Sequence, residues 1–77
     1  MKIQAIDTKK LVLFEQDAYE ITKNATSTFK INGVNYYLAN CILLYRDLYE
    51  ATFMSKEIIE IELEVVGDDI CQENVSL

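Results

Sequence analysis

The feature that most constrains the fold of this chain is the Asn32-Gly33 pair, which lies between two short apolar segments. Asn followed by Gly supplies the two residues with positive φ that a type I′ turn requires, and this turn matches the twist of two antiparallel strands. Pairing across the turn sets Ile31 opposite Val34, and two β-branched side chains pack well there. We therefore predict a β-hairpin over residues 28–38.

A second pattern, near the C-terminal end, alternates apolar with acidic side chains. Within residues 57–66, the alternating pattern consists of the apolar residues Ile59, Ile61, Leu63 and Val65 with the acidic residues Glu60, Glu62 and Glu64 between them. A period of two is typical of a strand with one buried and one solvent-exposed face. We predict a strand over residues 57–66. Two shorter strands, over residues 2–6 and 10–15, are expected to join at residues 7–9.

The helical content of the chain is harder to predict. Asp47-Leu48-Tyr49-Glu50 has the pattern of a capping box, which opens a helix, and it favours a short helix over residues 48–55. The alternative makes residues 48–54 another strand, in an all-β meander or small barrel. Residues 18–22 fit either a strand or a short helix opened by the capping-box pattern of residues 17–20.

Length and composition bound the architecture. A chain of 77 residues with 51% hydrophobic and 26% charged residues forms one small domain with a single core. We predict an α+β, β-dominated domain over residues 1–66, built on a small antiparallel sheet, and an acidic C-terminal tail over residues 67–77. No apolar run is long enough for a membrane span, and no secretion signal is recognisable, so we expect a cytoplasmic protein.

The residue types leave little room for catalysis. The chain has no His, which removes His-based proton transfer, His metal ligation and His-activated nucleophiles. Cys41 and Cys71 are far apart in the sequence, form no CxxC motif, and are expected to be free thiols that bind no zinc. We expect neither an enzyme nor a bound cofactor or metal.

The charge distribution restricts the partners. Residues 1–54 carry six basic and six acidic side chains, so the whole net charge of −6 belongs to residues 55–77. A chain without a basic patch has nothing to neutralise phosphates, which argues against direct binding to nucleic acid or to an anionic membrane. The same asymmetry permits a basic protein partner.

Two surfaces are candidates for that contact. The first is the acidic row Glu60, Glu62 and Glu64, whose carboxylates would stand about 6.7 Å apart on a strand and resemble a stretch of nucleic-acid backbone. The alternative is an ordinary solvated face, paired with Lys10 or Lys30. The second is aromatic, since Tyr is a preferred interface anchor, and it comprises Tyr37, Tyr45 and Tyr49. Its alternative is packing in or around the core.

These observations lead to two functional hypotheses. The first is a small acidic protein-binding module, by analogy a phage- or mobile-element-type inhibitor that occupies a surface of a host protein engaged in nucleic-acid binding or defence. The second is a structural subunit, a homo-oligomer that assembles through sheet edges into a tube or ring. The order of segments over residues 29–66 is similar to that in tube-forming subunits of contractile injection systems, without a shared residue-level motif and in a shorter chain.

Overall fold

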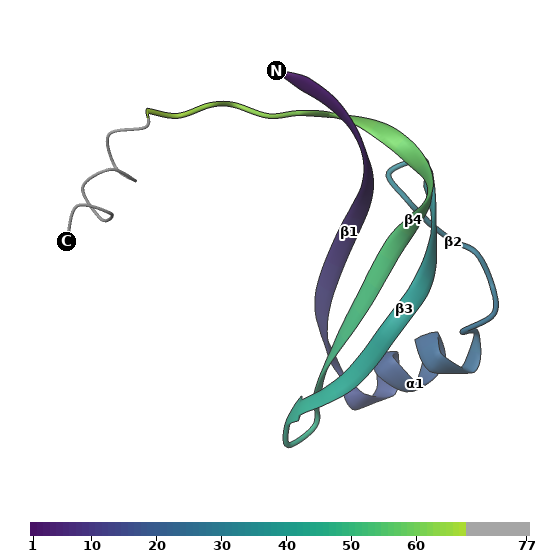
Figure 1. The fold of residues 1–77 in the computed structure, drawn as a ribbon. Coiled ribbons are helices and arrows are strands. Elements are labelled where there is room, and N and C mark those ends of the chain that lie inside the picture. The colour runs from purple at the N-terminus through teal and green to yellow at the C-terminus, as the bar shows by residue number, and fades with distance from the viewer. Residues whose placement is uncertain (68–77) are drawn as a thin grey trace.

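In a computed structural model, which describes residues 1–67, the chain forms a four-stranded antiparallel sheet with one helix packed against it (Figure 1). The elements follow the order β1 (Lys2–Phe14), α1 (Glu15–Lys23), β2 (Phe29–Ile31), β3 (Val34–Tyr45) and β4 (Leu48–Glu62). The strands lie in the order β1-β4-β3-β2, and the sheet does not close into a barrel. The predicted β-dominated α+β class is confirmed.

The predicted hairpin is present as β2 and β3. Asn32 and Gly33 have φ values of 51° and 82°, as a type I′ turn requires, and Ile31 pairs with Val34. Strand β2 covers only the beginning of β3, because its pairing ends at Phe29 opposite Tyr36. The outer edge of β3 from Tyr37 onwards therefore has no strand partner within the described residues.

The helix predicted over residues 48–55 is wrong, because this segment is the first half of β4. Its buried residues are Ala51, Phe53 and Ser55, which recur with a period of two rather than with helical spacing. Tyr45 and Leu48 pair across the two-residue connection Arg46-Asp47, so the first residue of the capping-box pattern lies in a second hairpin turn and the other three begin β4. Pairing with strands on both sides outweighs the weak local preference for a helix.

The helix lies instead at Glu15–Lys23, in the region where the sequence fitted either a strand or a helix. Strands β1 and β2 occupy opposite edges of the sheet, so the chain must cross one face between them, and α1 makes this crossing (Figure 1). Ala18 is buried, and Ile21, three residues later on the same helix face, packs against the core. Local propensity left this segment open, and the sheet order decides it.

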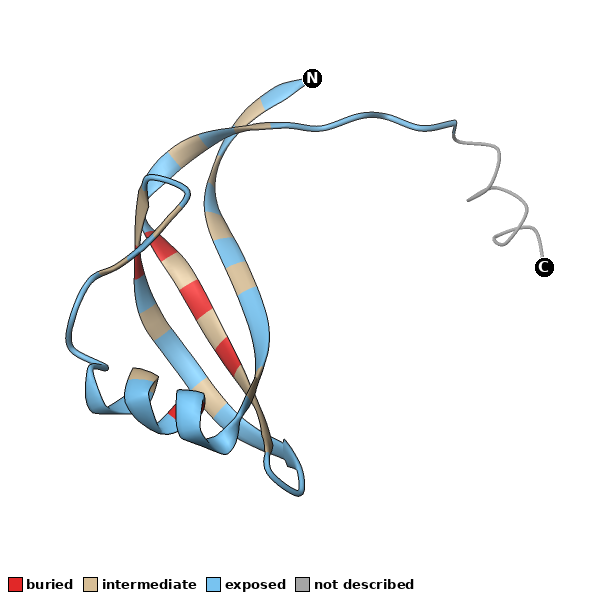
Figure 2. Ribbon diagram, turned by 180° about the vertical axis from the view of Figure 1, so that it is seen from behind, coloured by how far each residue is buried: buried red, intermediate tan, exposed pale blue. Residues whose placement is uncertain are grey.

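The core is small and lies between α1 and the sheet. Tyr36, Ala51 and Phe53 are buried at its centre, and the ring of Phe29 meets that of Phe53 edge-on at 5.1 Å between centroids. Figure 2 shows buried positions alternating along β4. Their side chains point to the face of the sheet on which Ile21 of α1 packs. One helix of nine residues covers this face, and the described residues place no element over the other.

The uncovered face, which we call the open face, is defined by the strand register. Side chains directly opposite each other on neighbouring strands share a face, and successive residues alternate between faces. On β1 the open face comprises Thr8, Lys10, Val12 and Phe14. On β4 it comprises Leu48, Glu50, Thr52 and Met54, and on β3 it comprises Tyr37, Asn40, Ile42 and Tyr45.

Strand β1 is one continuous strand rather than the two that were predicted. The predicted junction at residues 7–9 is the place where its register with β4 shifts, between the pairs Ile6–Ile58 and Thr8–Met54. Asp7 alone therefore stands opposite three residues of β4. Beyond this bulge the four-stranded sheet continues as a two-stranded ribbon of β1 and β4 (Figure 1).

Partly buried hydrogen bonds hold the bulge in place. The Asp7 backbone N–H donates to the Ser55 hydroxyl oxygen at 2.8 Å, and that hydroxyl donates to the Glu57 carbonyl at 2.9 Å. The Tyr36 hydroxyl donates to the Asp7 carboxylate at 2.6 Å, which ties β3 to the same point. Ser55, 2% exposed, thus satisfies two backbone groups that the irregular ladder leaves without strand partners.

The strand predicted over residues 57–66 forms only as far as Glu62. Ile59 and Ile61 are half-buried, as the alternation predicted, whereas Leu63 and Val65 are exposed. Glu62 pairs with Lys2, the first residue of β1, so β4 ends where its neighbour ends. Apart from Gly67, the predicted tail of residues 67–77 lies outside the described residues, and so does Cys71.

Replacement of Gly33 by Val is expected to lower the free energy of unfolding by more than about 1 kcal/mol, because a β-branched side chain is strained at positive φ. Urea denaturation followed by circular dichroism measures this change. Gly33→Asn is the matched control and should cost less, since Asn tolerates this conformation. Equal stability of Gly33→Val and wild type would contradict the type I′ turn.

Ser55→Ala is expected to destabilise the fold by about 1–3 kcal/mol, because it leaves the Asp7 N–H and the Glu57 carbonyl, which are partly shielded from water, without their hydrogen-bond partner. Ser27→Ala, in the connection between α1 and β2, is the control and should change stability by less than about 0.5 kcal/mol. If the two variants lose the same amount in denaturant titrations, the bulge does not depend on Ser55.

Candidate functional site

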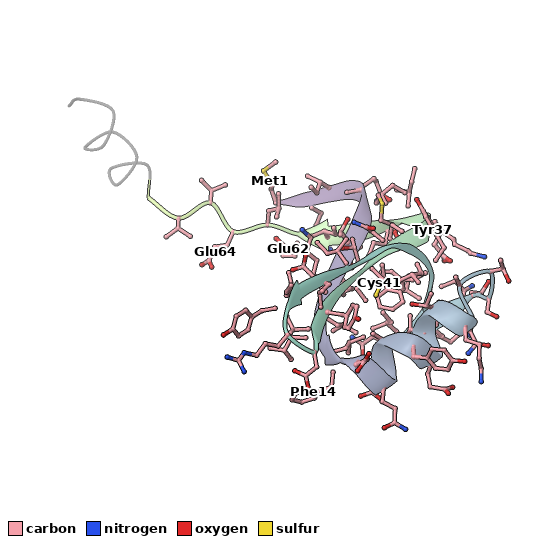
Figure 3. All side chains as sticks on the ribbon, turned by 90° about the horizontal axis from the view of Figure 1, so that it is seen from below. Met1, Phe14, Tyr37, Cys41, Glu62 and Glu64 are labelled. Carbon is pink, nitrogen blue, oxygen red and sulfur yellow. The ribbon has the colours of Figure 1, made fainter. Side chains whose placement is uncertain are left out.

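The acidic row is only partly assembled by the structure. Glu60 and Glu62 lie on β4, but Glu64 lies beyond the end of the strand (Figure 3). Lys2 Nζ is 3.4 Å from Glu60 Oε2, and the amino group of Met1 is 2.9 Å from Glu62 Oε2. The sequence pointed to Lys10 or Lys30 as partners, whereas the strand register brings Lys2 into place. Two of the three carboxylates thus have a cation within the chain, in exposed pairs of small energetic weight.

The three tyrosines proposed as an aromatic surface do not form one. Tyr37 and Tyr45 both belong to the open face, because two register shifts between them cancel. They are roughly 26 Å apart along β3. Tyr37 donates a hydrogen bond to Met54 Sδ at 3.6 Å, and the Arg46 guanidinium lies 5.1 Å from the ring centroid of Tyr45. Tyr49 points to the other face, toward α1.

The open face carries apolar residues that the sequence analysis did not single out. Phe14, Leu48 and Tyr45 form one row across β1, β4 and β3, and the next row contains Val12 and Ile42 on either side of Glu50. Two continuous apolar runs in the sequence carry the signal, residues 11–14 and residues 41–45. In an antiparallel sheet, such a run places apolar side chains on both faces, and a single helix covers only one.

A groove of about 340 Å³ lies between α1 and the sheet. We call it the α1 groove, and its walls are Glu15, Ala18, Tyr19 and Thr22 from the helix, Cys41 from β3 and Tyr49 from β4. Figure 3 shows Cys41 between the sheet and the helix, where the thiol is half-buried. Of the residues predicted to bind a partner, Tyr49 is the one that belongs to this groove. The sequence did not reveal the groove, because the position of α1 was undecided.

The ionisable groups at the bulge have shifted pKa values. The hydrogen bond from Tyr36 holds the pKa of the Asp7 carboxyl below its ordinary value of 3.8, and the nearby Lys9 ammonium, 3.3 Å away, acts in the same direction against the effect of burial. The same hydrogen bond, together with burial, raises the pKa of Tyr36 to about 12. The partners of Asp7 all belong to the sheet itself, so this cluster has the character of a structural joint.

Neither metal ligation nor a membrane span finds support in the part of the chain that the structure describes. Residues 1–67 contain no group of three or more Cys, Asp and Glu side chains placed to hold a metal ion. No helix among them is long and apolar enough to cross a membrane. Comparison with models of protein families, with curated proteins and with solved structures finds no match to this chain.

The pKa shifts at the bulge predict a defined pH dependence of stability. Because the pKa of Asp7 is lowered by folding, its contribution is present above pH 3.8 and is lost as the pH falls below that value. Because the pKa of Tyr36 is raised, its contribution is present below pH 10 and is lost as the pH rises through about 12. The free energy of unfolding, measured by denaturant titration across this range, should fall at both ends.

Tyr36→Phe isolates this contribution from the other titrating groups. The variant should be less stable than wild type at pH 7, and the difference between the two should shrink toward pH 12 and toward acid pH. Stability curves of the two proteins that run parallel over the whole range would show that the Tyr36–Asp7 hydrogen bond has no role in the pH dependence.

Proposed function

We propose that this chain is a small non-catalytic protein-binding module whose contact surface is the open face of the sheet. The observation that carries the proposal is the apolar character of that face, where Val12, Phe14 and Tyr45 are 60%, 63% and 62% exposed. Large contiguous apolar patches are uncommon on monomeric proteins and typically mark interaction sites. Tyr45, with a guanidinium against its ring, has the amphipathic character of an interface anchor.

The chemistry of the open face describes the partner. The anion Glu50 lies between Val12 and Ile42, the cation Lys10 lies in the next row beside Thr52, and neither charge is in an ion pair within the described residues. A matching partner surface is therefore mainly apolar, with a cationic group opposite Glu50. In this proposal the protein acts by covering that surface, which is also how an inhibitor of another protein works; the inhibitory role rests on analogy.

The acidic row has weaker support as the contact surface. A nucleic-acid mimic acts through carboxylates that are free to meet the cations of its partner. Here Glu60 and Glu62 already have cationic neighbours, and Glu64 lies outside the strand that would align it with them. The partner is therefore proposed to be recognised mainly by apolar contact, with the acidic charge assisting the encounter.

A second candidate function, self-assembly through a sheet edge, is favoured by one observation. Strand β3 contains no charged residue from Val34 to Tyr45, and β2 pairs with only its first three residues. Edge strands of stable monomers are usually protected by charged side chains or Pro, neither of which is present on this edge. Light scattering separates the candidates, because a monomer or dimer fits the binding module and a large ring or filament fits the structural subunit.

The binding surface is tested by matched variants of the open face. Ile42→Thr/Tyr45→Thr keeps residues that suit a strand but removes apolar contact area, and it is expected to weaken partner binding at least tenfold, about 1.4 kcal/mol. The partner is first captured from source-cell extract and identified by mass spectrometry, and its affinity for each variant is then measured with purified proteins.

Two controls make the outcome decisive. Leu43→Thr removes a comparably exposed apolar side chain from the opposite face of the same strand and should leave affinity unchanged. Glu60→Gln/Glu62→Gln/Glu64→Gln removes the acidic row and should slow association only modestly. A large loss in this triple variant, strong salt dependence and no loss in Ile42→Thr/Tyr45→Thr would transfer the interface to the acidic row.

A further inference from the structure

The polar groups that line the α1 groove favour a cationic ligand. Glu15 is the one charged side chain in its walls, and no Lys or Arg lines it. The Thr22 hydroxyl donates its hydrogen to the Ala18 carbonyl at 2.8 Å, so its oxygen faces other groups only as an acceptor. The tyrosine hydroxyls can also accept. A ligand that donates hydrogen bonds and carries positive charge therefore matches this groove.

The aromatic walls strengthen the match. Tyr19 and Tyr49 belong to different elements, the helix and β4, so their rings stand on different walls of the groove. The face of a tyrosine ring attracts cations, as shown by Lys23 Nζ, 5.8 Å from the ring centroid of Tyr19; a cationic ligand at this ring would share it with Lys23 or displace it. Tyrosine rings combined with a carboxylate are the chemistry by which proteins hold alkylammonium groups.

We propose that the α1 groove binds the cationic side chain of a lysine or arginine presented by a partner protein. This inference rests on the proposed function as a protein-binding module and adds a second contact on the opposite face of the sheet. The apolar stem of such a side chain would pass over Ala18 and Cys41, and its charged end would meet Glu15 and the tyrosine rings. The net charge of −6 favours a basic segment as the source.

The test uses the full chain, labelled with ¹⁵N, and blocked tripeptides as probes. Acetyl-Gly-Lys-Gly-amide and its arginine counterpart should shift the amide resonances of residues 15–22, 41 and 49 in a saturable manner. The same peptide with norleucine, which keeps the stem but lacks the charge, should bind at least tenfold more weakly. Equal binding of the lysine and norleucine peptides, or shifts spread over the whole chain, would overturn the proposal.

Two helix variants form a matched pair. Glu15→Gln and Asp17→Asn each remove one negative charge from the first turn of α1, but only Glu15 lines the groove. We expect Glu15→Gln to weaken peptide binding at least threefold, whereas Asp17→Asn should change the affinity by less than about 1.5-fold. Equal losses would mean that the peptide senses the net charge of the chain rather than the groove. Tyr19→Leu, at an exposed position, should also lose affinity.

The thiol of Cys41 provides a second readout. In a Cys71→Ser background, the lysine peptide should slow alkylation of Cys41 by iodoacetamide, because the thiol lines the occupied groove. If free n-butylammonium binds as tightly and protects as well as the peptides, the site takes small amines and the protein-partner assignment is wrong. Ile42→Thr/Tyr45→Thr should bind the peptides normally, so failure of the groove and failure of the open face are separately visible.

Discussion

The hydrogen bonds around Ser55 are the contacts on which the rest of the sheet depends. At this point β4 passes from the centre of a four-stranded sheet into a two-stranded ribbon, and its register with β1 shifts. The Ser55 hydroxyl accepts from the Asp7 backbone N–H and donates to the Glu57 carbonyl, and the Tyr36 hydroxyl joins β3 to the same point by donating to the Asp7 carboxylate. The irregular ladder would otherwise leave partly buried backbone groups without hydrogen-bond partners, which destabilises a fold. The same group of hydrogen bonds therefore supports both the main sheet and the β1–β4 ribbon beyond the bulge.

The mismatch between one helix and a sheet with two apolar faces leads to the functional proposals. Strands β1 and β3 carry apolar side chains on both faces, yet α1 covers only the side that holds Tyr36 and Phe53. The remaining apolar area is exposed in the single chain, and the functional proposals take it as the contact surface for a partner protein or a second copy. The helix packs incompletely even on its own side and leaves the α1 groove, whose walls are acidic and aromatic rather than purely apolar.

The candidate site was predictable in part, and the limits have physical causes. That Tyr37 and Tyr45 share a face followed from their even spacing, although two bulges had to cancel for it to hold. Tyr49 was grouped with them because aromatic residues are concentrated in this part of the sequence, but its neighbours in the structure are Cys41 and the helix α1. The acidic row was visible as a pattern, but its cationic neighbours depend on the pairing of β4 with the first strand, which no local signal specifies.

By itself, the sequence determined the elements whose geometry is local. Asn32-Gly33 requires a tight hairpin because few other residue pairs adopt two positive φ values, and the alternation from Ile59 to Glu62 requires a strand because only a period of two separates its apolar and acidic side chains. Only the tertiary structure decided that residues 48–55 are a central strand, that the helix lies at Glu15–Lys23, and that β4 stops at Glu62. Each of these depends on which strand lies alongside, and that choice is made by non-local pairing and burial, which outweigh the small free-energy differences of local propensity.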